Sequence, residues 1–338
     1  MTEVNVKKEI ANNISRISSE GADYVDARYY LDDSSETLLL YDGDLEANDT
    51  TVESGIGVRV LWEGAWGFSA TSDPSGIDAC FAKAAANART ASRLVNVPLS
   101  MGAGEAVKGS YASPVEVDPF SVSLQDKLAF LTRLDNDLKE DFILKRMVFV
   151  NFQKKKIHFQ NSDGSEINKD LASVFGTIMV MALDSDGEMQ RRSMSLYSTG
   201  DGTAGWKMMS DPELFAGHAA RVRSELAELI KAEPLEYGRR SVILLPGQGH
   251  LQVHETIGHP LELDRILGYE LSYAGGSFVD LDSFGKLRYG SDKLSVSSYG
   301  SIANSPAHSG SMMMEPLSVI ISLLTGVSWS TPLHQEQW

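Results

Sequence analysis

The sequence predicts an α+β fold in which antiparallel sheets pack against helices. Short runs of strand-like residues follow one another across polar, glycine-containing turns such as Asn161-Ser-Asp-Gly164 and Asp184-Ser-Asp-Gly187. Segments with helical spacing flank these groups of strands and do not alternate regularly with them, as they would in βαβ units. A buried apolar run, a turn and a further helix then follow towards the C-terminal end.

Residues 1–95 are predicted to form an N-terminal α/β domain. A helix is expected over 3–19, because Val4, Ile10, Ile14 and Ile17 have helical spacing, and a second over 77–94. Cys80 falls on the apolar stripe of the second helix, where it is interpreted as a small buried hydrophobe and not as a ligand. The strands expected between the helices are 24–31, 36–41, 46–53, 55–61 and 65–70, with Asp32-Asp-Ser-Ser35 as a connecting loop.

Residues 96–122 are rich in Pro, Gly and Ser and are predicted to be a connector, followed by a central antiparallel sheet with helices over 123–233. Lys154-Lys-Lys156 is interpreted as a solvated hairpin turn. Gly200-Asp-Gly-Thr-Ala-Gly205 matches G-x-G-x-x-G, but a flexible loop is favoured over a dinucleotide site because no βαβ context surrounds it. Ser210 and Glu213 suggest a capping box for a helix reaching about Ala232, with His218 packed on its core side. The other elements expected here are a helix over 125–138 and strands over 145–152, 156–160, 166–181 and 189–198.

The composition limits the classes of partner. The 338 residues carry 30 Lys and Arg against 46 Asp and Glu, a formal net charge of −16, so binding to phosphate backbones is disfavoured. One cysteine excludes an internal disulfide framework and fits a reducing compartment. The N-terminus lacks a signal-peptide core, and the longest apolar run, 316–327, is too short to span a bilayer. These observations predict a cytoplasmic protein that binds neither nucleic acid nor membrane.

The most informative stretch runs from His250 to Asp264 and contains H-E-x-x-x-H, formed by His254, Glu255 and His259. Two imidazoles are ligands of the kind that Zn²⁺ prefers, and a neighbouring glutamate can take a proton from a metal-bound water. Five residues apart on a regular α-helix, the histidines would point about 140° away from each other. A π-bulge or a helix end near Thr256–Gly258 is therefore expected if they share a metal. Arg240 to Leu245 is predicted to be a buried strand that leads through a turn into this helix.

The run from His254 to Glu270, followed by Tyr273-Ala-Gly-Gly-Ser-Phe278, resembles the TldD/PmbA metallopeptidases, in particular the TldD-like branch that bears the motif. Asp42-Gly-Asp-Leu-Glu46, Gly55 to Leu61 and Gly64 to Thr71 resemble the family's N-terminal domain. The resemblance implies a zinc peptidase acting on short or unfolded peptides, with His254 and His259 as metal ligands and Glu255 as general base. Glu262 is expected to orient an imidazole as a hydrogen-bond acceptor.

The resemblance also implies that a cysteine far downstream completes the metal site, whereas Cys80 lies in a different region. Residues 234–296 are therefore interpreted as a partial, mostly-β metallopeptidase domain. Residues 297–338 show no period and do not resemble the family. Regrouping their codons by one nucleotide permits family-like letters such as x-D-D-G at 312–315, so this tail is interpreted as a shifted reading frame.

Two functions follow as alternatives. The first is a zinc-dependent peptidase subunit; the second is a catalytically incomplete, non-enzymatic subunit of a TldD/PmbA-type complex, favoured by the missing third ligand. Either is expected to form a homo-oligomer, or a hetero-oligomer with a PmbA-like subunit. A third interpretation, modulation of DNA topology, is disfavoured by the negative charge.

Overall fold

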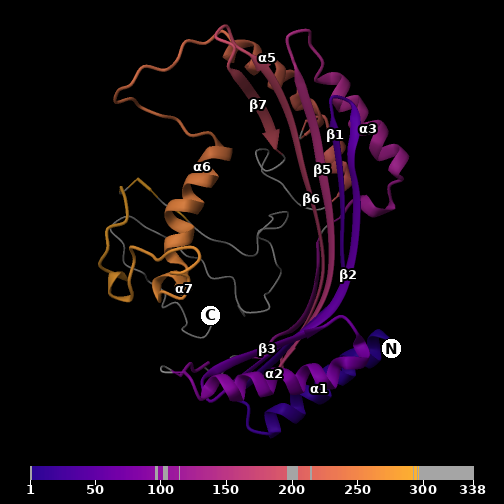
Figure 1. Ribbon diagram of the computed structural model, residues 1–338, viewed down its shortest axis with the longest axis vertical. Coiled ribbons are helices and arrows are strands. Elements are labelled where there is room, and N and C mark those ends of the chain that lie inside the picture. Colours follow the sequence, from indigo (N-terminus) through magenta and orange to yellow (C-terminus); the bar gives the residue numbers. More distant parts are fainter. Residues whose placement is uncertain are drawn as a thin grey trace.

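The computed structural model describes residues 2–95, 98–101, 106–113, 115–195, 205–213, 215–291, 293–294 and 296. It confirms the predicted α+β class, with helices and a largely antiparallel sheet (Figure 1). The strands are β1 (Tyr24–Tyr41), β2 (Asp44–Trp62), β3 (Ala65–Thr71), β4 (Lys108–Ala112), β5 (Lys145–Asn161), β6 (Glu166–Leu183) and β7 (Met189–Ser195).

The α-helices are α1 (Glu3–Ser19), α2 (Ile77–Ser92), α3 (Leu124–Asp137), α4 (Trp206–Ser210), α5 (Ala219–Leu229), α6 (Pro246–Val253) and α7 (Leu263–Ile266). Short 3₁₀ turns lie at Pro74–Gly76, Pro119–Ser121, Ala216–His218, His259–Leu261 and Leu281–Ser283, and a π-helical turn at His254–Gly258. Within the described residues, no helix is long and apolar enough to cross a membrane.

All seven strands belong to one sheet, in the order β3-β2-β1-β5-β6-β4, with β7 pairing β6. Neighbouring strands are antiparallel except β4, which runs parallel to the first residues of β6. Type I′-like hairpins join β1 to β2 and β2 to β3, since the paired turn residues Asp42-Gly43 and Glu63-Gly64 all have positive φ. The sheet therefore runs without interruption from the predicted N-terminal region into the central one.

The helices α1 to α5 cover one face of this sheet. Val25 and Ala27 of β1 pack with α1 and α2, whereas Leu38 and Leu40 pack with α3 and α5. The core-facing residues of β1 therefore have odd numbers near its start and even numbers near its end. A bulge between Tyr30 and Asp32 causes this change, because it shifts the alternation of side chains by one residue. Both hydrophobic cores consequently lie on the same side of the sheet.

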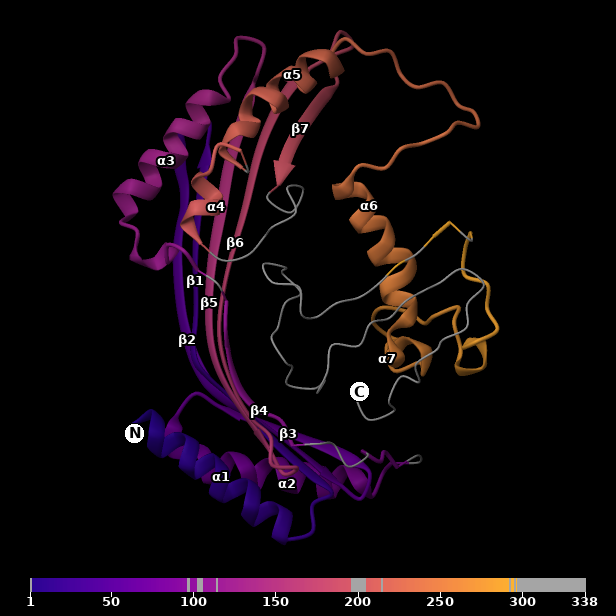
Figure 2. The same ribbon diagram turned by 180° about the vertical axis from the view of Figure 1, so that it is seen from behind.

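The other face of the sheet is concave. Figures 1 and 2 show α1 to α5 along the outer, convex side and α6 with α7 on the inner side, reached by an extended connection from α5. This arrangement places the H-E-x-x-x-H segment on the open side of the sheet and away from both hydrophobic cores.

Two polar stretches that were predicted to be loops lie inside long strands. Asp32 to Ser35 is part of β1, and Lys154 to Lys156 lies in the middle of β5, directly opposite it in the ladder. Lys155 pairs with Asp33 at 3.4 Å, and Lys154 and Lys156 pair with Asp118 and Asp170. Charge compensation, across the strands for Lys155 and Lys156 and from a neighbouring turn for Lys154, explains why these polar residues continue the strands.

Several other boundaries differ from the prediction. The connector over 96–122 contains β4, and the two strands predicted at 145–152 and 156–160 are the single strand β5. Ser210 does not cap a helix with Glu213; the Asp211 carboxylate accepts the hydrogen bond from the Glu213 amide, and α5 begins only at Ala219. His218 is half-buried at the preceding 3₁₀ turn, and not within the core.

The buried strand predicted at Arg240–Leu245 is wrong. These residues have no regular structure, and Val242 and Ile243 are 74% and 90% exposed. A strand needs a ladder partner, and none of the described residues pairs with this segment. The described elements that follow, from α6 to the 3₁₀ turn at 281–283, are helical, in contrast to the mostly-β character expected for 234–296. The glycine-rich loop at 200–204 and the tail 297–338 lie outside the described residues.

Candidate metal centre

The motif lies where helix α6 changes its winding. Pro246 occupies the first turn of α6, where its missing N–H costs nothing. The helix is regular to Val253, and then a π-helical turn spans His254–Gly258, closed by the His259 N–H donating to the His254 carbonyl. The predicted bulge near Thr256–Gly258 is thus confirmed, and its wider turn brings residues five apart onto one side.

Pro260 provides a physical cause for this winding. In an α-helix the N–H of residue 260 would donate to the carbonyl of Thr256, but proline has no N–H. The Thr256 carbonyl instead accepts a hydrogen bond from the Tyr289 hydroxyl, and the Thr256 hydroxyl donates back to the Gln252 carbonyl at 2.6 Å. The bulge does not require a glycine at position 258, because the φ of −57° and ψ of −69° of Gly258 are open to any residue.

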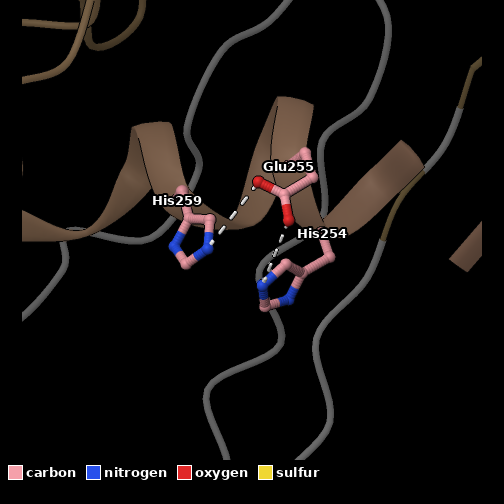
Figure 3. Close-up of side chains that lie close together, drawn as sticks. All are labelled: His254, Glu255 and His259. Atoms are coloured by element: carbon pink, nitrogen blue, oxygen red, sulfur yellow. Dashed lines mark ion pairs between the residues drawn. The ribbon is translucent and has the colours of Figure 1, made fainter. Parts of the chain in front are cut away.

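The π turn gathers the three motif side chains, as Figure 3 shows. The His254 and His259 rings lie edge to face with centroids 4.3 Å apart. The Glu255 carboxylate lies between them, with one oxygen 4.0 Å from His254 Nε2 and the other 3.9 Å from His259 Nε2. One ligand atom from each residue lies within 4.8 Å of the others, so a single cation can contact all three.

A second layer of contacts fixes His259. Its Nδ1 hydrogen-bonds the Glu262 carboxylate at 2.9 Å, which leaves Nε2 directed at the cluster. Arg265 Nε donates to the other oxygen of Glu262 at 2.6 Å, and Arg265 Nη1 donates to the Ala274 carbonyl at 3.1 Å. Burial alone would raise the pKa of Glu262, but the hydrogen bonds from His259 and Arg265 outweigh it and lower that pKa. Glu262 is therefore an ionised acceptor for an Nδ1–H.

The cluster is open to solvent in the described part of the chain. The side chains of His254 and Glu255 are 49% and 56% exposed, and that of His259 is 26% exposed. His250 lies one helical turn earlier, its ring centroid 6.3 Å from that of His254, and is outside the cluster. Cys80 is 4% exposed in the core beneath α1 and α2, where burial raises the pKa of its thiol, as expected for a packed side chain.

Sequence reasoning missed two residues that hold the site in shape. Arg265 follows Glu262 by three residues, a spacing at which helical side chains meet, so its ion pair was readable in principle. Tyr289 lies 33 residues from Thr256, and no local pattern signals that contact.

Comparison with known proteins gives three findings. Residues 26–88 match the sequence profile described as PmbA/TldA metallopeptidase domain 1. The chain is 24% identical to a metalloprotease of Methanocaldococcus jannaschii over 75% of this chain and 55% of that protein, and 25% identical to a metalloprotease of Methanothermobacter thermautotrophicus over 75% and 57%. A Thermotoga maritima crystal structure, described as a candidate modulator of a DNA gyrase, matches with a TM-score of 0.67 and 15% identity, over 96% of this chain and 70% of that one.

By these matches the chain carries a domain of metallopeptidase type. More narrowly, residues 26–88 match a domain of the TldD/PmbA family, which agrees with the resemblance predicted for the N-terminal segments. The chain spans about half the length of the curated relatives that it matches. The matched profile ends well before His254.

Proposed function

We propose that the chain is a zinc-dependent peptidase subunit that cleaves short or unfolded peptides. His254 and His259 hold the metal, and Glu255 acts as general base. The observation that supports this function best is the convergence of three ligand atoms within 4.8 Å of one another on a π turn. A regular helix would separate the same histidines.

The donor set fits a zinc ion. Zinc accepts imidazole nitrogen, and catalytic sites use three protein ligands with one open position, so His254 and His259 would supply two of the three. When bound, zinc lowers the pKa of a coordinated water to about 7 and polarises a carbonyl. The hydrogen bond to Glu262 holds His259 in the Nδ1–H tautomer, so its Nε2 lone pair is available to the metal.

Glu255 then supplies the proton transfer. Its carboxylate is adjacent to both metal-facing nitrogens, where a water molecule held between them lies within its reach. It takes a proton from the attacking water and returns it to the amine that leaves when the peptide bond breaks. Because the cluster is exposed, an extended peptide can approach it without unfolding any described element.

Nucleic acid is a poor candidate for the substrate. The structural relative from Thermotoga maritima is described in terms of DNA gyrase, but this chain carries a net charge of −16. The lysines at 154–156 are each paired with a carboxylate and form no basic surface.

Substitution of Glu255 by Gln tests the proposal. Zinc content after dialysis should stay within about twofold, while peptide hydrolysis should fall by about 10²–10⁴-fold. Glu236→Gln, at a side chain that is 93% exposed, removes the same charge as a control and should change neither quantity. Loss of zinc from the Glu255 variant would instead make Glu255 a ligand, and unchanged hydrolysis would exclude it as the base.

The alternative, a non-enzymatic subunit of a TldD/PmbA-type complex, predicts a different result. Hydrolysis would then depend on a motif-bearing partner subunit and survive Glu255→Gln in this chain. Assays of the chain alone and with that partner, each with and without chelator, separate the two functions.

A further inference from the structure

The concave face of the sheet carries a pocket of about 570 Å³ at the end covered by α1 and α2. It lies over β1, β2 and β3. Phe68 and Ala70 contribute apolar surface, and Arg28, Arg59 and Asp26 contribute charge. Gly57 pairs directly with Arg28 in the ladder, and the Phe68 ring lies over Gly57, 3.5 Å from the place that a Cβ atom would take.

Most charges around this pocket are compensated. Arg59 donates to both oxygens of Asp26, with Nε at 3.0 and 3.1 Å, and its guanidinium lies 5.1 Å from the Trp66 ring centroid. Lys155 pairs with Asp33 at 3.4 Å. These pairs leave no free charge for a ligand.

Arg28 is different. Its Nε is buried and has no hydrogen-bond partner among the described residues, and its guanidinium lies 5.9 Å from the Phe159 ring centroid. A buried N–H without an acceptor costs about 1–3 kcal/mol, and more when the group is charged. Such a group calls for an acceptor that is not part of the described chain.

A second cation lies close to Arg28. Lys169 of β6 is only 5% exposed and makes no ion pair in the described part of the protein. Burial, and then the charge of Arg28, lower the pKa of Lys169. The sheet register places Lys169 opposite Ile157, and Ile157 opposite Tyr30, so both cations face the concave side. Two neighbouring cations that make no ion pair within the described residues make this surface attractive to an anion.

We propose that the Arg28 end of this pocket binds a carboxylate of a peptide. The planar guanidinium matches the two oxygens of a carboxylate, and the apolar surface of Phe68, which is 59% exposed, can take the adjoining side chain. Asp33 and Glu53 on the same pocket wall disfavour a multiply charged phosphate. The carboxylate comes from a C-terminus or an acidic side chain. This site does not depend on the metal centre.

Calorimetry on the full, chelator-treated chain tests the site. Trialanine with a free C-terminus should bind, and its C-terminal amide should bind at least about tenfold more weakly. Ala-Glu-Ala amide distinguishes the sources: binding as tight as trialanine would assign the site to acidic side chains, and weak binding would assign it to a C-terminus. If the acid and both amides bind equally, or none binds, the site does not recognise carboxylates.

The variants are Arg28→Gln and Lys169→Met, with Lys156→Gln and Lys156→Met as matched controls. Lys156 is an exposed residue on the same sheet, paired with Asp170. Each test variant should weaken trialanine binding about 10- to 100-fold, and each control less than twofold. If the controls weaken trialanine binding equally, the loss of binding comes from the change in net charge and not from a specific site. Lys169→Met should also leave the unfolding midpoint unchanged or raised, because it removes a buried charge that has no ion-pair partner. A large fall in the midpoint would show that Lys169 does have such a partner.

Discussion

Tyr289 donates its hydroxyl hydrogen bond to the main-chain carbonyl of Thr256, the carbonyl that Pro260 leaves without its helical partner. This contact joins the segment after the last 3₁₀ turn to the bulge that aligns the two histidines. Burial raises the pKa of Tyr289, which keeps its hydroxyl protonated as the donor.

The first prediction is that Tyr289→Phe lowers zinc affinity about fivefold, the effect of losing one hydrogen bond that holds the bulge. Competition with a chromophoric chelator measures it. Tyr269→Phe is the matched control, because the Tyr269 side chain is 63% exposed and its hydroxyl has no partner among the described residues. Equal affinity of both variants would show that the contact does not support the site.

The second prediction concerns Pro260→Ala. Alanine restores the N–H that can donate to the Thr256 carbonyl, so the π turn should shorten to an α turn and rotate His259 away from His254. Zinc affinity should fall about tenfold or more. Adding Tyr289→Phe to this variant should then change little, since the carbonyl is already occupied. Pro246→Ala, at the start of α6, is the control, and additive losses in the double variant would contradict the mechanism.

The third prediction is that Arg265→Gln weakens zinc binding by about 10- to 100-fold, as when a group that orients a metal ligand is removed. Glu262 loses one of its two partners, and the Ala274 carbonyl loses its donor. Arg288→Gln, at an exposed arginine of the same segment, should bind zinc normally. A fall in thermal stability without a change in zinc affinity would make Arg265 merely structural.

The fourth prediction concerns the buried ion pair of Lys127 with Glu36, 2.5 Å apart, which joins α3 to the sheet. Lys127→Met leaves the Glu36 carboxylate without a counter-charge and should cost about 3–5 kcal/mol of unfolding free energy. Urea denaturation measures it. The double variant Lys127→Met with Glu36→Gln should recover most of the loss, and failure to recover would assign the cost to packing.

Sequence patterns gave the local features of this protein and missed those that depend on distant residues. The π turn was predictable because, at a spacing of five residues, helix geometry leaves only a π-bulge or a helix end to align two imidazoles. Lys127, in contrast, is buried on α3, although lysine is a residue type that sequence patterns place on the surface. Its partner Glu36 is 91 residues away. Asp33 was predicted to lie in a loop because its counter-charge is also distant in sequence. Lys155 becomes its neighbour only when β1 and β5 pair in the sheet. The apolar run at 242–245 has strand-like composition, but composition does not supply a partner strand.

The fifth prediction concerns pH. His158 is fully buried on the convex face of β5; its Nδ1 lies 2.9 Å from the Asn168 side-chain oxygen, and its Nε2 has no partner in the described residues. Burial lowers its pKa below the ordinary 6.5. The unfolded chain therefore binds more protons than the folded one below pH 6.5, so this contribution to stability is present above that pH and is lost as pH falls through the folded pKa. His158→Gln, which keeps a donor for Asn168 but does not titrate, should flatten the fall in the urea midpoint between about pH 7 and 5. His218→Gln, at a half-buried histidine outside the core, should keep the wild-type slope. If His158→Gln keeps that slope as well, protonation of His158 does not contribute to acid destabilisation.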